Sequence, residues 1–181
     1  MPIALMAPPA YMTLQAKAKP KPATPAAAPA KAASKPKWDG EWTLSAGDSD
    51  GIKDRITAFT QGMNIFQRTV WKKKLANACL PYDTLSVLGG VGYSFTFGRE
   101  VPINVDANGT GDAWTRQDGE KFQVSVKQLA PNSLSLALQG DGYTLNDAIE
   151  IDGDTITVRV TYSSPKLDQP FDFSQVYKRN D

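Results

Sequence analysis

The chain has no histidine and a single cysteine, Cys79, among its 181 residues. One cysteine allows neither an intramolecular disulfide nor a thiolate metal cluster. The absence of histidine excludes imidazole metal ligands and histidine-based catalysis. The chain therefore lacks the residues that oxidoreduction, zinc hydrolysis and the usual catalytic triads require. We expect neither a metal site nor a cofactor.

A hydrophobic run long enough to cross a bilayer as a helix is also lacking at the N-terminus, where Pro8 and Pro9 interrupt residues 1–16. No basic residue precedes this apolar stretch, which a complete signal peptide should have. The residues from Thr13 to Lys17 nevertheless resemble a signal-peptidase site, with Ala16 at the cut. A start codon assigned too far downstream would have removed the basic region that a complete signal peptide carries. We expect a periplasmic or secreted protein, with a cytoplasmic location and a chance apolar N-terminus as the alternative.

Acidic residues are absent from residues 1–37, which alternate Ala, Pro and Lys. Such a segment cannot bury enough apolar surface to offset its ordering, so we expect a disordered, stiff tether, the remnant of a signal peptide plus a linker. It serves either as a spacer or as a contact for anionic cell-wall polymers or membrane.

Residues 38–181 hold all nineteen acidic residues and fourteen of the twenty basic ones, a net charge of −5 against +6 in the tail. An acidic body argues against nucleic acid as a partner, because phosphate binding relies on clustered Lys and Arg. Its length is that of one domain. We expect a monomer.

The stretch from Asp48 to Pro81 carries the helical pattern of this domain. Asp50 is the expected N-cap of a first helix, and Gly62 is the expected left-handed stop. Asn64 followed by Gln67 predicts a capping box that opens a second helix, and Pro81 ends it.

The remainder is typical of short antiparallel strands, because apolar and polar residues alternate between Gly-containing turns such as Asp118-Gly119 and Asp152-Gly153. Pro102 reduces residues 101–106 to an edge or irregular strand. A strand, two helices and about nine more strands predict a mainly β fold, an antiparallel up-and-down barrel of about ten strands with a helix-turn-helix lid after strand 1. Which strand faces point inward is left open.

The opening Gly40-Glu41-Trp42 resembles the Gly-x-Trp motif of lipocalins and intracellular fatty-acid-binding proteins, which are calycin β-barrels. The helical pair after the first strand and the final strand with Tyr177 are similar to the fatty-acid-binding branch in particular. Residues 114–120 and 163–167 also resemble lipocalin-like proteins of the bacterial envelope.

This resemblance implies a small hydrophobic ligand inside the barrel, which enters past the helical lid. Fatty-acid binders of the family anchor the carboxylate with an Arg-x-Tyr pair on the last strand, and this chain has Gln175-Val176-Tyr177 there. Tyr177 fits that pattern and Gln175 does not, so Arg116 or Arg159 would have to substitute by pointing inward. The alternative for either arginine is an exposed strand position paired with a surface carboxylate. The expected ligand contacts are Trp114, Arg116, Arg159, Gln175 and Tyr177.

The second predicted helix is basic on one side. A basic amphipathic helix with an interfacial Trp can dock on anionic membrane, and family lids are thought to meet membranes in this way, although a solvated face is the commoner role of such a pattern. The predicted portal residues are Arg68, Trp71, Lys72, Lys73 and Lys74.

Acidic residues offer no convincing catalytic or metal-binding set. Two pairs, Asp141 with Asp147 and Glu150 with Asp152, are assigned to turns, where solubility and turn geometry explain them. Residues 106–112 alternate oxygen ligands as calcium loops do, but the twelfth position is Gln117 and no helices flank the loop, so a hairpin turn is favoured.

We therefore expect a non-catalytic protein that sequesters or carries a small hydrophobic or amphipathic ligand in its barrel. The alternative is a structural or interaction module of the cell envelope with a filled barrel. A wide lumen would favour the first function, and a packed interior the second.

Overall fold

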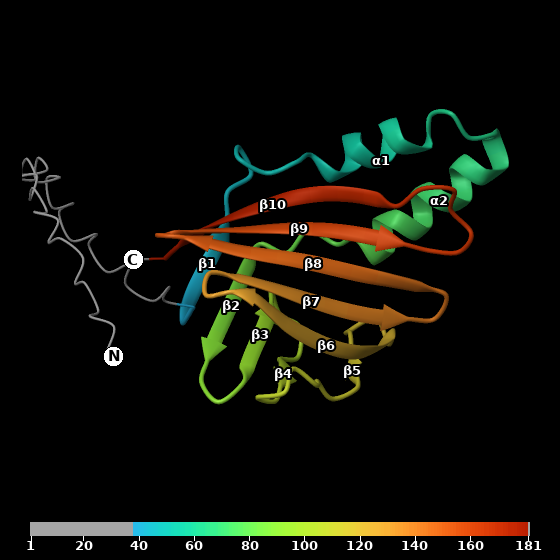
Figure 1. Cartoon of the computed structure of the whole chain (residues 1–181). Coiled ribbons are helices and arrows are strands. Elements are labelled where there is room, and N and C mark those ends of the chain that lie inside the picture. The colour runs from blue at the N-terminus through green and yellow to red at the C-terminus, as the bar shows by residue number, and fades with distance from the viewer. Residues whose placement is uncertain (1–37, 181) are drawn as a thin grey trace, which may run out of the picture. The chain divides into compact units, whose positions relative to one another are not determined.

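A computed structural model describes residues 38–180, and the predicted tail and signal-peptide remnant lie outside the described residues. Two helices follow the first strand, and nine more strands follow the helices (Figure 1). The element bounds are β1 Gly40–Leu44, α1 Ile52–Thr60, α2 Ile65–Ala78, β2 Thr84–Gly89, β3 Tyr93–Phe97, β4 Ile103–Val105, β5 Trp114–Thr115, β6 Lys121–Ala130, β7 Ser133–Gly140, β8 Tyr143–Asp152, β9 Thr155–Ser163 and β10 Phe171–Arg179.

The ten strands form one antiparallel sheet in the order β4-β3-β2-β1-β10-β9-β8-β7-β6-β5. Strands adjacent in sequence pair with each other except β4 and β5, which are the two edges of the sheet. Strand β1 pairs with both β2 and β10 and so joins the first and last strands of the domain. The predicted mainly β, up-and-down barrel of about ten strands with a helical pair after strand 1 is confirmed.

The segment between β4 and β5 brings the sheet's two free edges together. Val105 bridges Gly111, Thr110 bridges Ser125, and the amide of Val126 donates to the Gly109 carbonyl at 2.7 Å. Gly109 has φ +81°, and an added Cβ there would overlap the Val126 carbonyl oxygen, so this close approach requires glycine. The barrel is therefore nearly closed.

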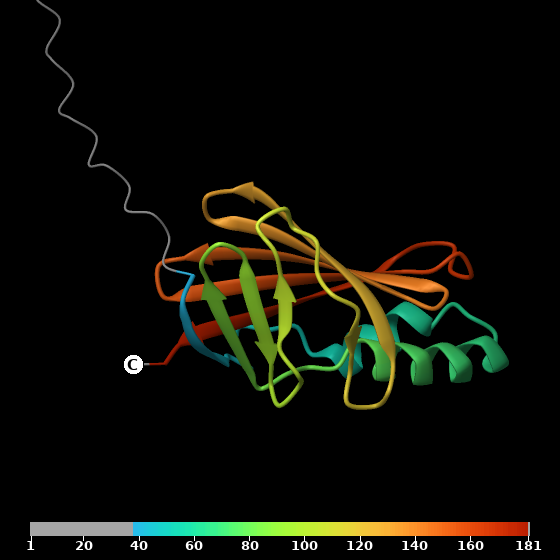
Figure 2. The ribbon, with the colours of Figure 1, turned by 90° about the horizontal axis from the view of Figure 1, so that it is seen from below.

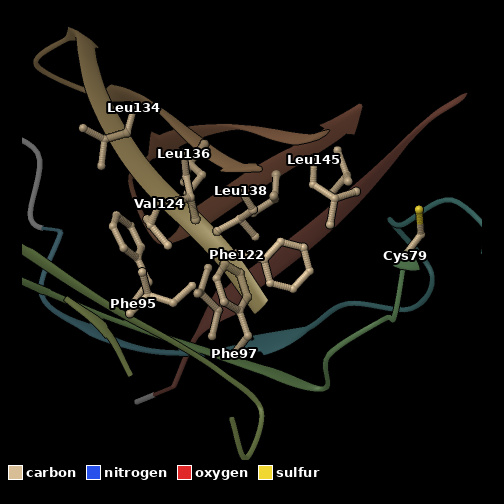
Figure 3. Packing of buried hydrophobic residues seen from close by; sticks show 14 of the residues in the cluster. Cys79, Phe95, Phe97, Phe122, Val124, Leu134, Leu136, Leu138 and Leu145 are labelled. Atoms are coloured by element: carbon tan, nitrogen blue, oxygen red, sulfur yellow. The ribbon is translucent and has the colours of Figure 1, made fainter. Parts of the chain in front are cut away.

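The inward faces of the strands are aliphatic and aromatic, which settles the face assignment that the alternation alone left open. On β7, Leu134, Leu136 and Leu138 are buried, while Ser135 and Ala137 between them are only half-buried. Figure 3 shows Phe95 and Phe97 of β3 and the leucines of β7 directed into the same space between the barrel walls. The interior is thus largely filled by the protein's own side chains.

The helices lie together at one end of the barrel (Figure 2). Helix α1 packs on β10 through Phe59, whose ring centroid is 5.2 Å from that of Phe171. Helix α2 buries Trp71, Leu75 and Ala78, and Trp71 meets Tyr162 of β9 edge-on. Neither helix in residues 38–180 is long and apolar enough to cross a membrane.

The helix boundaries confirm one predicted cap and correct two others. The Asn64 side chain accepts from the Gln67 amide at 2.9 Å, as the capping-box pattern predicts. The N-cap of α1 is Gly51, and Asp50 instead accepts from the Ser174 amide of β10, because tertiary pairing with the sheet takes its carboxylate. Gly62 directly follows the C-cap Gln61, but its φ is not positive, so α1 ends without the predicted left-handed stop.

Candidate functional site

A cavity of about 30 Å³ lies between the C-terminal end of α2 and the inner face of β5, β6 and β8 to β10. Apolar side chains form most of its wall, including Phe97, Phe122, Leu145 and Val160. A water molecule needs about 10–15 Å³ measured in this way, so the cavity has room for about two waters. The interior therefore has no wide lumen, and by the criterion stated above this packing favours the filled-barrel alternative.

Asp147 interrupts the apolar wall of this cavity. It occupies an inward position of β8, in register with Leu145 and Ile149, and is 6% exposed. Its Oδ1 has no hydrogen-bond partner among residues 38–180, and burial raises the pKa of its carboxyl from 3.8 to about 7. The assignment of Asp147 to a turn is wrong, because it lies in the middle of a strand.

Gln175 and Tyr177 contribute polar groups from the inward face of β10. The single proton of the Tyr177 hydroxyl is shared between the Tyr82 carbonyl and Gln175 Oε1, each 3.2 Å from the hydroxyl oxygen. Gln175 lines the cavity and is 5% exposed, and its Nε2 has no partner in the described part of the chain. Burial raises the pKa of Tyr177, so its hydroxyl stays protonated and holds the glutamine oxygen.

Arg116 follows β5 and points inward, with its side chain only 2% exposed. Its Nη2 lies 2.6 Å from Asp118 Oδ2 and 2.7 Å from Glu120 Oε2, and its Nη1 donates to the Ala78 carbonyl at 3.2 Å. Burial opposes the charge, but the hydrogen bond and attraction of Asp118, helped by Tyr82 and Glu120, raise the pKa of Arg116. The Arg116 guanidinium thus points inward, as a carboxylate anchor would require. It is already paired with Asp118 and Glu120, however.

Trp114 also lines the cavity, where its ring lies 5.5 Å from that of Phe122. Its Nε1 donates to the Val101 carbonyl at 2.8 Å, so the indole presents only apolar surface to the interior. Trp114, Arg116 and Gln175 line one cavity and Tyr177 adjoins it through Gln175, whereas Arg159 lies apart from them.

The structure contradicts Arg159 as an interior ligand contact. Arg159 is an exposed residue of β9, between the buried Val158 and Val160. Because successive strand residues point to opposite faces, its side chain lies on the outside of the barrel.

The predicted portal residues of α2 do not share one exposed face. Trp71 is 8% exposed, and the amine of Lys74 lies 5.2 Å from its ring centroid, so Trp71 faces the barrel and is not at an outer interface. Arg68 donates to the carbonyls of Gln61 and Met63 and thereby ties α2 to the turn before it. Lys73 and Lys74 are exposed, and Lys72 is half-buried.

The exposed apolar surface of α2 is formed by other residues than the predicted Trp71. Ile65, Phe66 and Val70 are 72%, 83% and 51% exposed. Phe66 and Val70 share a helical ridge with Lys74, a spacing that is visible in the sequence. We call Ile65, Phe66 and Val70 the α2 outer patch.

Asp147 is the cavity residue that the sequence analysis missed as a site residue. The signal that could have found it is the alternation of β8, where Leu145, Asp147, Ile149 and Ile151 occupy one face. An acidic residue at an otherwise aliphatic face is unusual, because burying an unpaired carboxylate is costly.

No protein-family model and no curated protein matches this chain. Solved structures match it at the level of fold. A Schistosoma mansoni fatty acid binding protein in complex with arachidonic acid is 16% identical over 80% of this chain and 96% of its own, with a TM-score of 0.50. A secretory abundant heat soluble protein from Ramazzottius varieornatus is 12% identical over 79% of this chain and 95% of its own, with a TM-score of 0.53.

A luciferase domain from the dinoflagellate Lingulodinium polyedrum is also similar, at 10% identity over 79% of this chain and 42% of that chain, with a TM-score of 0.50. These neighbours show that the chain shares the barrel fold of fatty acid binding proteins. The predicted fold resemblance is thus confirmed, and the expected bacterial envelope origin finds no support among them. Since the neighbours include an enzyme, the fold alone does not separate binding from catalysis.

Proposed function

We propose that this protein binds a small amphipathic molecule without transforming it, and that the polar end of the ligand occupies the cavity beneath the end of α2. The observation that carries this proposal is the pair of unpartnered polar atoms, Asp147 Oδ1 and Gln175 Nε2, in side chains that line an otherwise mostly apolar cavity. Apolar pockets with a few convergent polar groups and a perturbed pKa are typical of ligand sites.

The size of the cavity limits what enters it. A space of about 30 Å³ admits a polar head group, while a longer chain requires α2 or the cavity side chains to move. The neighbouring fatty acid binding protein holds arachidonic acid, which lends general support to an interior site in this fold. The small space of about 30 Å³ in this chain favours a small ligand.

A filled barrel that acts as a structural or interaction module is the second candidate. The packing of Phe95, Phe97, Leu136 and Leu138 across the interior favours it (Figure 3). In that case ordered water, and no ligand, would satisfy Asp147 and Gln175.

The side chains around the cavity support binding over catalysis. Burial raises the pKa of the Cys79 thiol to about 12, so little reactive thiolate forms near neutral pH. Asp147 stands without a hydrogen-bonded nucleophile or second acid among the described residues, and a general base needs such a partner within reach.

The outer face of α2 supports peripheral docking on anionic membrane as part of ligand delivery. The α2 outer patch combines exposed apolar surface with the nearby cations Lys73 and Lys74, as interfacial helices do. Export to the periplasm or medium remains a proposal based on residues 13–17, which lie outside the described part. N-terminal sequencing of the protein recovered from its native cells tests whether cleavage follows Ala16.

Binding of an uncharged environment-sensitive dye, such as N-phenyl-1-naphthylamine, tests the ligand site. Val160→Leu adds a methylene at the cavity wall, and we expect it to weaken dye binding about tenfold, because a methylene takes up about half of a space that holds about two waters. Val105→Leu is the matched control, since Val105 is equally buried on β4 and does not line the cavity. Absence of dye binding, or equal binding by both variants, would contradict an interior site.

A further inference from the structure

We infer that the cavity selects a ligand with a nitrogen cation, an alkylammonium head group, and rejects a carboxylate. This inference rests on the proposed function and assigns its ligand class. It follows from three features of the cavity. The Arg116 guanidinium is already paired, the buried Asp147 carboxyl has an oxygen without a partner, and the Gln175 amide has a free donor.

The guanidinium of Arg116 is not available to an anionic ligand. Asp118 and Glu120 contact its Nη2 at 2.6 and 2.7 Å, and Nε donates to Asp118 Oδ1 at 3.1 Å. Its remaining Nη1 bond goes to the Ala78 carbonyl. A carboxylate would therefore have to displace two carboxylates of the protein, which are covalently held beside it and so have the advantage of proximity.

The charge around the cavity favours a cation. Asp147 is the acidic side chain among the described residues that lines the cavity, and the positive charge of Arg116 is offset by Asp118 and Glu120, which contact it from the neighbouring surface hollow. The buried Glu100 accepts from the Gln117 amide close by and adds further negative charge. An ammonium group would thus enter a negative environment in which only Arg116 repels it at short range.

Asp147 provides the acceptor for such a group. It is the one acidic side chain among residues 38–180 that lines this cavity, and Oδ1 has no partner. An ammonium donates a charge-assisted hydrogen bond to a carboxylate, which is stronger than a bond between neutral groups. It also removes the penalty of an unpaired buried charge.

Gln175 sets the second contact of the head group. Through β9, Asp147 is in register with Val160 and Gln175 with Val158, so the two polar residues lie two strands apart on the inner face. Because the Tyr177 hydroxyl occupies Gln175 Oε1, the free Nε2 offers a donor. The site therefore suits an amine with a nearby hydroxyl or ether oxygen to accept from Gln175.

The groups that face Asp147 come from every element packed on the cavity. Arg116 is the cation that lines the cavity with Asp147, and its donors are taken by Asp118, Glu120 and the Ala78 carbonyl. Tyr82 and Tyr177 stay neutral because burial raises the pKa of each, and burial does the same for the Cys79 thiol. Lys74 of α2 and Lys166 lie at a separate surface hollow with Asp118, Glu120 and Asp141. Burial is the cause of the raised pKa of Asp147.

Titration of the full chain with hexylamine, hexanol and hexanoate by calorimetry tests the head-group assignment. At about pH 8, above the pKa of Asp147 near 7, we expect hexylamine to bind at least about tenfold more tightly than hexanoate. Asp147→Asn should lose most of this preference while hexanol binding persists. Asp152→Asn, an exposed position on the same strand, should leave all three affinities unchanged.

A second readout does not depend on the variant folding normally. The carboxyl carbon resonance of Asp147 reports its protonation, and hexylamine should lower the pKa of Asp147 because a bound cation favours the charged form. Preferred binding of hexanoate, or an unchanged pKa at saturating hexylamine, would overturn the head-group assignment and leave interior binding intact. Failure of all three compounds together with the dye would overturn the proposed function itself.

Discussion

The hydroxyl of Tyr177 donates to Oε1 of Gln175 at 3.2 Å, so two neighbouring inward residues of β10 form one polar unit. The hydroxyl shares its single proton with the Tyr82 carbonyl as well, which ties β10 to the segment that follows α2. This unit fixes the glutamine beside the cavity and links the cavity to the segment after α2.

Replacing Tyr177 with Phe should lower the free energy of unfolding by about 1 kcal/mol, the usual net value of a lost buried hydrogen bond. Urea denaturation measures this change. Tyr93→Phe is the control, because the half-buried Tyr93 makes no side-chain hydrogen bond within residues 38–180. Equal stability losses in the two variants would show that the Tyr177 contacts contribute nothing.

Asp147 should give the protein a distinctive dependence of stability on pH. Its pKa is about 7 when folded and close to 3.8 when unfolded, so between these values the folded state binds more protons. The stabilisation that this proton provides is fully present below about pH 4 and is lost as pH rises towards pH 7. Groups with lowered pKa, such as Asp118, act in the opposite direction.

Asp147→Asn isolates that contribution. The variant should gain stability relative to the wild type as pH rises from about 5 to 8, by about 2 kcal/mol, because the neutral amide never ionises. Urea denaturation at both pH values measures the difference, with Asp152→Asn as the exposed control. Parallel pH profiles of the wild type and Asp147→Asn would contradict the buried, unpaired carboxyl.

Replacing Arg116 with Met should lower the free energy of unfolding much more than replacing Arg159 with Met. Arg116→Met leaves Asp118, Glu120 and the Ala78 carbonyl without their partner, and we expect a loss of about 2 kcal/mol, since two of these acceptors are partly solvated. Arg159→Met on the outer face should change stability by less than about 0.5 kcal/mol. Thermal or urea unfolding of the two variants would contradict the assignment if the losses were similar.

The α2 outer patch should govern membrane docking. Phe66→Ser combined with Val70→Ser should abolish co-sedimentation with vesicles of anionic lipid, while leaving the unfolding midpoint unchanged because both residues are exposed. Val91→Ser is the matched control, since Val91 is 89% exposed away from α2. Binding of the wild type to neutral vesicles as strongly as to anionic ones would exclude a role for Lys73 and Lys74.

The sequence predicts much of the fold because local signals and tertiary packing agree there. The alternation in β7 to β9 and the Asn64 cap are examples of such agreement. Asp50 departs from its predicted role because a distant strand, β10, competes for its carboxylate. Strand β5 has two residues because Arg116 begins a hairpin around its acidic partners.

The candidate site is less predictable, because its members come from α2, β5, β8 and β10 and converge only once the barrel has curved. The alternation of apolar and polar residues in the sequence treats Arg116 and Arg159 alike. Only the folded structure shows that the Arg116 side chain is buried and that Arg159 lies on the outer face. Sequence spacing likewise says nothing of the cavity's volume, which depends on how Phe97, Phe122 and Leu145 fill the interior.

Native mass spectrometry of the gently purified full chain, followed by solvent extraction, tests the central claim most directly. The account predicts a stoichiometric small amphiphile with a basic nitrogen, absent from Val160→Leu and retained by Val105→Leu. A protein that is free of ligand, and that takes up neither the dye nor any of the three hexyl compounds, would contradict the binding function and favour a filled structural barrel.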